Sequence, residues 1–120
     1  MDVLVVDDSR TMRMIVQRSI RQAGFRTLVV GEAENGKQAL LALEKEQPKL
    51  ILSDWNMPEM SGIDFLKQVR TTTQVPFGFI TSEASAEIRE LAMNSGANFL
   101  ITKPFSPEDI QDALSPIIKD

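Results

Sequence analysis

The sequence predicts a single α/β domain, a five-stranded parallel sheet with helices on both faces. Short apolar runs alternate five times with segments of helical periodicity, and only short connections separate them. This alternation is typical of parallel strand–helix units. A length of 120 residues allows a substantial core but not two domains, so residues 1–120 are expected to form one domain.

The five strands are expected in the apolar runs. The first, Val3-Leu4-Val5-Val6, has the uninterrupted apolar character of a strand buried on both faces. The third, Leu50-Ile51-Leu52, lies between Pro48 and Pro58, which limit its length. The complete set of expected strands is 3–6, 27–30 with an extension toward 33, 50–52, 77–80 and 99–101.

The first two helices are bounded by cap and turn residues. Ser9 is expected to cap the first helix, and Gly24 ends it where a left-handed residue is favoured. Asn35-Gly36 is interpreted as a turn before the second helix, which reaches about residue 46. The expected inward faces of these helices are Met12, Ile15, Val16, Ile20 and Ala23, then Ala39, Leu40 and Leu43.

The other three helices also carry start and stop signals. The third begins at Ser61-Gly62 and ends before Thr71, because three consecutive threonines are poor helix formers. The fourth is expected at about 84–95. The fifth begins after Ser106, which proline and two acids follow, and Pro116 ends it. The inward residues expected from the last three helices are Ile63, Leu66, Val69, Ile88, Leu91, Ala92, Ile110 and Leu114.

Composition excludes several classes of function. The net charge of -4 argues against nucleic acid or an anionic membrane as a direct partner. The chain has no cysteine and no histidine, which removes disulfides, thiolate metal sites and the commonest general base. No apolar run approaches the roughly 18 residues of a membrane span. Met1-Asp2 leads directly into a strand without a basic leader, so a cytoplasmic location is expected. The protein is also expected to be a monomer.

Chemically matched residues follow four of the expected strands: Asp7, Asp8, Asp54, Thr81 and Lys103. The carboxyl ends of parallel strands lie at one edge of a sheet, where ligands bind. Three carboxylates there repel one another, and a divalent cation together with the lysine ammonium would balance their charge. An all-oxygen donor set favours Mg²⁺. Asp54 could then act as a carboxylate nucleophile toward a phosphoryl group.

Each of these residues also has an ordinary structural interpretation. Asp7 and Asp8 can cap a helix, Asp54 can be a turn residue, Thr81 can end a strand, and Lys103 can be solvated. Each interpretation is plausible alone. Their joint occurrence at one sheet edge favours a site.

Several motifs give the chain a family resemblance that extends over essentially its whole length. They are the run Ser53-Asp54-Trp55-Asn56-Met57-Pro58, the acidic pair Asp7-Asp8, Thr81 and Lys103-Pro104-Phe105. The sequence resembles the receiver domain of two-component response regulators, especially the single-domain chemotaxis type. This resemblance implies a flavodoxin-like (βα)₅ doubly wound sheet with strand order 2-1-3-4-5, and a cis Lys103–Pro104 bond.

The resemblance also implies a function as a phosphoacceptor rather than an ordinary enzyme. A sensor histidine kinase or phosphotransfer protein would present a phosphohistidine, and Asp54 would take its phosphoryl group with help from Thr81 and Lys103. The domain would later dephosphorylate itself and regulate a downstream protein target. The implied Mg²⁺ site consists of Asp8, Asp54 and the Asn56 backbone carbonyl, with Asp7 acting through water.

Three further positions bear on how such a site is regulated. Asn56 and Glu83, two residues after Asp54 and Thr81, would flank the path of the hydrolytic water. The family usually has Tyr or Phe three residues before the lysine, and this chain has Leu100. Phe99 is adjacent but should face the opposite side of its strand. Conventional aromatic switching is therefore not expected.

Three alternative functions for this chain differ in kind: nucleotide binding, flavin binding and protein interaction without phosphorylation. Residues 31–38 match a nucleotide P-loop except that Gln38 replaces the Mg²⁺-binding Ser/Thr, and two glutamates stand where phosphates would lie. A flavin-binding module of the same topology would need a hydroxyl- and glycine-rich loop after the first strand, where two acids stand instead. The third alternative, an interaction module without regulated phosphorylation, is favoured by Leu100.

Overall fold

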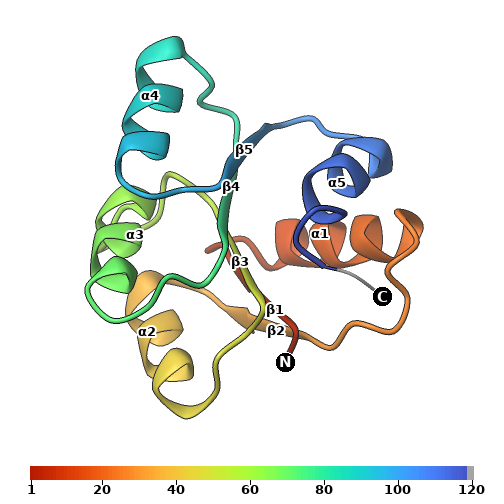
Figure 1. The fold of residues 1–120 in the computed structure, drawn as a ribbon, viewed down its shortest axis with the longest axis horizontal. Coiled ribbons are helices and arrows are strands. Elements are labelled where there is room, and N and C mark those ends of the chain that lie inside the picture. Colours follow the sequence, from red (N-terminus) through yellow and green to blue (C-terminus); the bar gives the residue numbers. More distant parts are fainter. Residues whose placement is uncertain (119–120) are drawn as a thin grey trace.

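A computed structural model describes residues 1–118. In it the chain forms alternating strands and helices (Figure 1). The strands are β1 (Val3–Val6), β2 (Val30–Ala33), β3 (Leu50–Ser53), β4 (Phe77–Thr81) and β5 (Phe99–Thr102). The helices are α1 (Arg10–Gln22), α2 (Gly36–Lys45), α3 (Gly62–Arg70), α4 (Ala86–Asn94) and α5 (Pro107–Leu114).

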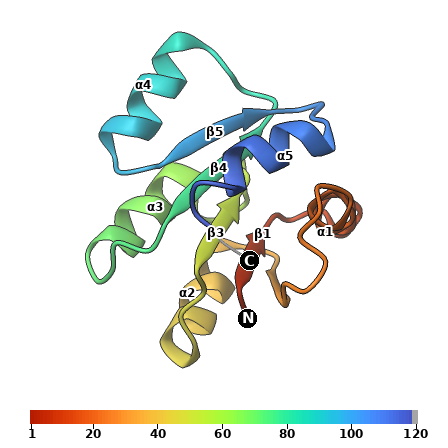
Figure 2. The same cartoon turned by 45° about the vertical axis from the view of Figure 1, so that its right-hand side comes forward.

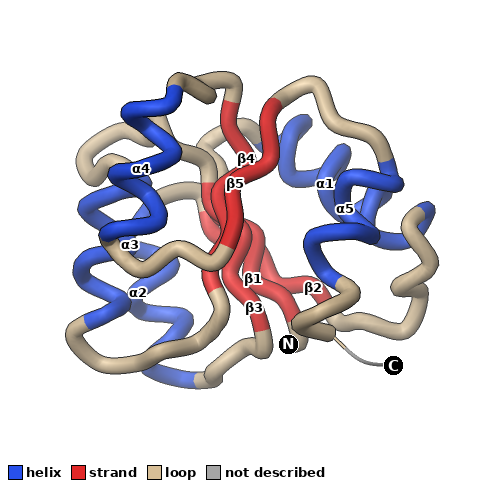
Figure 3. Tube along the Cα trace, turned by 45° about the horizontal axis from the view of Figure 1, so that its top comes forward, coloured by secondary structure: helices blue, strands red, loops and turns tan. Residues whose placement is uncertain are grey.

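The strands form one parallel sheet in the order β2-β1-β3-β4-β5, which confirms the predicted fold class and topology. Helices α1 and α5 cover one face, and α2, α3 and α4 cover the other (Figures 1 and 3). Figure 2 shows β5 at the edge of the sheet, between α4 and α5. Each face of the sheet has its own buried apolar cluster, since parallel strands in such a fold are covered on both sides.

Every helix begins at a side-chain cap that accepts the N–H group of the residue three positions on. The caps are Ser9, Asn35, Ser61, Ser85 and Ser106. Three of them confirm predicted helix starts, and the fifth helix ends before Pro116 as expected. The interpretation of Asn35-Gly36 as a separate turn was wrong. Asn35 is the cap of α2, and Gly36 is its first residue.

The starts of two elements also differ from the sequence prediction, and β3, β4 and β5 each extend one residue past the expected range, to Ser53, Thr81 and Thr102. β2 begins at Val30 rather than Thr27. The Val29 N–H group donates to the Asp2 carboxylate, and its carbonyl accepts from Asp2 and Val3, so residues 27–29 approach β1 without joining its ladder. α4 begins at Ala86, because Ser85 caps it and excludes Ala84.

Two residues predicted to point inward are largely exposed: Ile15 at 40% and Leu91 at 44%. The buried stripe of α1 is centred on Val16 and Ile20, which leaves Ile15 on its flank. α4 lies at the β5 side of the sheet and fully buries only Ala92. Its apolar periodicity therefore overstated how much of the helix the core covers.

Residues 31–38, which match a nucleotide P-loop in part, are divided mainly between two regular elements. The first of these residues, from Gly31 to Ala33, belong to β2, Glu34 connects the two elements, and the rest belongs to the cap and first turn of α2. The Gln38 side chain donates to the Glu34 carboxylate at 2.8 Å, so this segment presents an acid that would repel a phosphate. The segment has no open loop with which to hold a nucleotide.

None of the helices within residues 1–118 has the length and apolar character needed to cross a bilayer.

Candidate functional site

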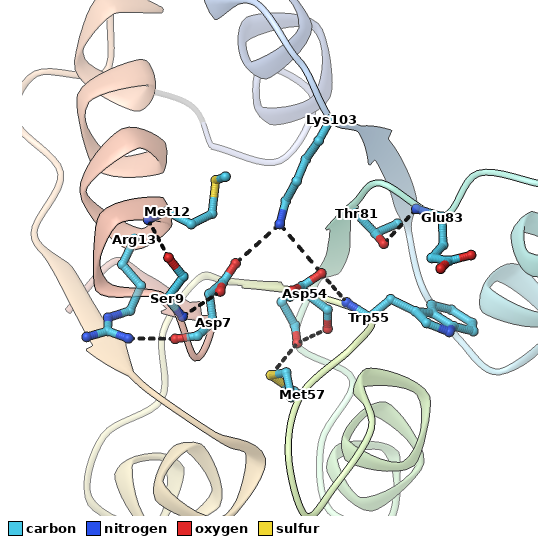
Figure 4. A network of polar contacts seen from close by, with 11 residues as sticks. Asp7, Ser9, Met12, Arg13, Asp54, Trp55, Met57, Thr81, Glu83 and Lys103 are labelled. Atoms are coloured by element: carbon cyan, nitrogen blue, oxygen red, sulfur yellow. Dashed lines mark hydrogen bonds and ion pairs between the residues drawn. The ribbon is translucent and has the colours of Figure 1, made fainter.

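The carboxyl ends of β1, β3, β4 and β5 bring the predicted site residues together (Figure 4). Main-chain bonds extend the strand ladders into these ends. The Asp54 N–H group donates to the Val6 carbonyl at 2.9 Å, and the Lys103 N–H group donates to the Thr81 carbonyl at 2.9 Å. The side chains that follow the strands are therefore held by the sheet itself. Rigid placement of this kind suits a reacting group.

Lys103 lies between the two less exposed carboxylates of the site. Its ammonium is 3.4 Å from Asp7 Oδ2 and 3.6 Å from Asp54 Oδ1. The side chains of Asp7, Asp54 and Lys103 are only 7%, 14% and 19% exposed. Electrostatic attraction between these groups is screened much less than it would be at an open surface. The peptide bond between Lys103 and Pro104 is cis, as the resemblance implied.

The loop after β1 holds Asp7 tightly and leaves Asp8 at the surface. Asp7 Oδ1 accepts the Ser9 N–H group at 2.9 Å, while Asp7 Oδ2 faces Lys103. Asp8 is exposed. With both Asp7 oxygens engaged, Asp8 is the more accessible of the two acids for direct contact with a cation.

The donor set fits a magnesium ion. One carboxylate oxygen from each of Asp7, Asp8 and Asp54 lies within 4.8 Å of the others. Opposite oxygens around one Mg²⁺ are roughly 4.2 Å apart, because each bond is about 2.1 Å long. Small side-chain movements would therefore bring all three within reach of one ion. Oxygen donors alone also match the preference of Mg²⁺.

Burial raises the pKa of Asp54 above its usual range. The charge of Asp7 adds to this effect, whereas Lys103 and the N–H groups of Trp55 and Asn56 oppose it. The folded protein therefore disfavours the ionised form of the residue expected to be the nucleophile. A bound cation would reverse that preference.

Thr81 and Trp55 complete the inner part of the site. Thr81 is fully buried, and its hydroxyl accepts the Glu83 N–H group at 3.0 Å, which fixes the loop after β4. The Trp55 N–H group donates to Asp54 Oδ1 at 2.7 Å, and its ring lies 4.9 Å from that of Phe79. The only tryptophan is thus bonded to the proposed acceptor and can report on changes there.

The loop after β3 permits no side chain at Gly62, which starts α3. Its N–H group donates to the Trp55 carbonyl at 2.7 Å, and a Cβ atom at this position would collide with the Asp54 carbonyl oxygen. A glycine is therefore required where α3 approaches the site.

The remaining predicted positions lie around this centre. Asn56 and Glu83 are exposed at its rim. Leu100 is half-buried against the cluster on the α2–α4 face, whereas Phe99 packs on the α1–α5 face, where its ring covers Gly78. The structure thus shows the opposite orientations expected of neighbouring strand residues. Sequence reasoning missed one residue that contacts the centre, Arg13, because its role depends on two partners distant in the chain.

Replacing Asp54 with Asn should stabilise the metal-free protein at neutral pH. A raised folded pKa means that ionisation costs the folded state more than the unfolded state, so this penalty grows as pH rises from the unfolded value to the folded value. Each unit of difference corresponds to roughly 1.4 kcal/mol. Urea denaturation in a chelator should show a gain at neutral pH that disappears below about pH 4.

The exposed Glu44→Gln change on α2 is the matched control for this experiment, and it should alter stability little at either pH. An Asp54→Asn protein that was less stable than wild type at neutral pH would contradict the pKa argument.

Comparisons with known proteins agree with this geometry. The family described as "Response regulator receiver domain" matches residues 3–115. Chemotaxis protein CheY1 of Helicobacter pylori is 36% identical, covering 98% of this chain and 97% of that protein. Chemotaxis protein CheY-3 of Vibrio cholerae is 38% identical, covering 99% of this chain and 92% of that protein. The solved structure of Vibrio cholerae CheY4 superposes with a TM-score of 0.84 at 35% identity, over 97% of both chains.

Proposed function

Because the chain belongs to the response-regulator receiver-domain family, we propose that it is a phosphoacceptor signalling domain whose acceptor is Asp54. The phosphoryl group would come from the phosphohistidine of a sensor histidine kinase or phosphotransfer protein. The observation that carries this proposal is the Lys103 ammonium between the Asp7 and Asp54 carboxylates at the strand ends. The similarity to CheY proteins favours an output of the chemotaxis or motility type, from a cytoplasmic monomer.

In the proposed transfer, an Asp54 carboxylate oxygen attacks the phosphorus atom and the bond from phosphorus to the donor imidazole breaks. The imidazole nitrogen keeps the electron pair and takes up a proton. Lys103 stabilises charge on the phosphoryl oxygens, and the Thr81 hydroxyl donates to one of them. In the later hydrolysis, water attacks phosphorus, the bond to Asp54 breaks, and inorganic phosphate leaves.

Asp8, Asp54 and the Asn56 carbonyl would hold Mg²⁺, with Asp7 contributing through water. Carboxylate oxygens of the three aspartates lie within 4.8 Å of one another, which supports this arrangement. A bound ion would neutralise carboxylate charge and would stabilise negative charge on the phosphoryl group. The chain itself contributes the fixed positions of its carboxylates, which the β1 and β3 ends and the Ser9 N–H group hold.

Intact-mass analysis tests this function directly. The purified protein, treated with an acyl phosphate or a phosphoramidate, should gain one phosphoryl group in Mg²⁺ and none in a chelator, and the Asp54→Ala variant should gain none. Titration with Mg²⁺ should also change Trp55 fluorescence, and Asp8→Ala should weaken that response. A phosphoryl group on the Asp54→Ala protein would rule out the assigned acceptor.

A second candidate is a phosphorylation-independent interaction module of the same fold. Leu100 favours it, since the side chain that usually signals phosphorylation in this family is absent. The same experiment separates the two functions, because an interaction module of this kind would gain no phosphoryl group.

We further expect phosphorylation to be transmitted only weakly to the face formed by α4, β5 and α5. This face contains a groove of about 390 Å³ whose lining includes Leu100 and Asp112. Leu100 shares its side of the sheet with Thr81, but it is smaller than an aromatic residue and has no hydroxyl. It therefore offers little energy difference between two states of the site.

Amide chemical-shift mapping with and without a phosphoryl mimic measures this transmission. Shifts across residues 88–114 should be small in wild type and larger in Leu100→Tyr. Large wild-type shifts that the tyrosine left unaltered would show that coupling does not depend on position 100.

A further inference from the structure

Arg13 contacts the acidic cluster, which consists of Asp7, Asp8 and Asp54, from the side formed by α1 and β2. Its side chain is only 12% exposed. The guanidinium Nη1 group donates to the Asp7 carbonyl at 2.6 Å, and Nε donates to Glu32 Oε1 at 2.9 Å. Figure 4 shows Arg13 reaching from the first turns of α1 to the backbone of Asp7. One planar group thus joins helix, loop and sheet.

The contact with Arg13 completes the restraint of Asp7. The Asp7 N–H group donates to the Ala33 carbonyl at 3.1 Å, and its carboxylate accepts from Ser9 and Lys103. Because a peptide group is planar, fixing the Asp7 carbonyl also fixes the direction of the Asp8 N–H group. Arg13 therefore restrains the main chain that carries both acids.

Glu32 gives the Arg13 charge a partner outside the site. It lies on β2 opposite Val5, and a hydrogen bond from Arg13 is the largest cause lowering its pKa. The guanidinium consequently has a carboxylate of its own, and the three carboxylates of the site do not have to neutralise it. The planar guanidinium bonds Glu32 and the Asp7 carbonyl through two different nitrogens, whose directions are fixed relative to each other.

We propose that Arg13, with Glu32, is a positioning residue for the cation site: it holds the Asp7–Asp8 segment so that both carboxylates face Asp54. This inference rests on the proposed function, since it assumes that the cluster binds Mg²⁺. It extends that function by assigning part of the cation affinity to a side chain that does not touch the ion. Removing groups that orient metal ligands typically weakens metal binding about 10- to 100-fold.

The sign of the effect separates positioning from simple electrostatics. A cation near the cluster repels Mg²⁺, so on charge alone Arg13→Gln should bind the ion more tightly. If Arg13 positions the acids, the same change should raise the Mg²⁺ dissociation constant about tenfold. Arg13→Lys keeps the charge but replaces two nitrogens of fixed direction by a single one, so it should also weaken binding. Arg18→Gln, an exposed position on the same helix, should leave the constant unchanged.

The constants are measured by titrating Trp55 fluorescence with Mg²⁺, and amide shifts of Asp8 and Ser9 are recorded in the metal-free proteins. We expect these amides to move in both Arg13 variants and to stay in place in Arg18→Gln. Should Arg13→Gln fail to fold, Arg13→Lys decides the question by itself. Unchanged or tighter binding in folded Arg13 variants would overturn the positioning role alone. A wild-type protein that did not respond to Mg²⁺ would overturn the proposed cation site, and this inference with it.

Discussion

Replacing Lys103 with Ala is expected to slow phosphorylation of Asp54 on the order of 10²- to 10³-fold, as loss of one donor to developing charge does elsewhere. The ammonium lies 3.4 Å from Asp7 and 3.6 Å from Asp54, where it can also reach an incoming phosphoryl group. The measurement is the rate of phosphoryl mass gain from an acyl phosphate at saturating Mg²⁺.

Mg²⁺ binding should respond in the opposite direction. Lys103 and a bound ion would share the same carboxylates, so removal of the ammonium should leave the Trp55 titration unchanged or shift it to lower Mg²⁺ concentration. The exposed Lys67→Ala change on α3 is the control for loss of one positive charge. If Lys103→Ala lost Mg²⁺ binding together with phosphorylation, the lysine would be serving the geometry of the cation site instead of the transfer step.

The sequence was sufficient to predict which residues gather at the carboxyl edge of the sheet, because two independent signals coincide there, although β3, β4 and β5 each extend one residue past the predicted run. The apolar runs mark where strands stop, and the residues that follow, Asp7, Asp54, Thr81 and Lys103, differ sharply from the runs before them. Parallel topology then brings all four to one edge without any knowledge of side-chain packing. The structure places these residues as that reasoning requires.

Features that depend on contacts between distant segments could not be predicted in the same way. Strand propensity is good in residues 27–29. The Val29 N–H group nevertheless donates to the Asp2 carboxylate, and β2 begins one residue later, at Val30. Asn35-Gly36 is a strong turn signal, but the same asparagine is also a good helix cap. The role of Arg13 requires the pairing of β1 with β2, which places Glu32 and Asp7 within reach of one side chain.

Leu100 illustrates a different limit. Its position in the strand and its orientation followed from the period of two, and the structure places it on the side of the sheet opposite to Phe99. The effect of Leu100 on signal transmission did not follow from the sequence. Coupling between the site and the distal face depends on the difference in free energy between two states of the protein. A sequence pattern predicts the position of Leu100 in one folded state, and the energy of the second state depends on contacts that the pattern does not contain.

The phosphoryl group on Asp54 should be short-lived, and basic or bulky substitutions at Asn56 or Glu83 should prolong its life about 10- to 100-fold. Hydrolysis needs a water molecule in line with the bond that breaks, and misplacement of such a reactant by about 1 Å can cost roughly 10²-fold. Both residues are exposed at the rim of the site, and the bond from the Glu83 N–H group to Thr81 holds one of them in place. Asn56→Arg and Glu83→Lys would narrow the path by which water approaches the phosphoryl group.

The lifetime is measured as the decay of phosphoryl mass after the phosphoryl donor is removed. The control is Glu87→Lys on α4, which makes the same charge change as Glu83→Lys at a position away from Thr81. Equal lifetimes in all of these proteins would mean that access of water at the rim does not limit hydrolysis.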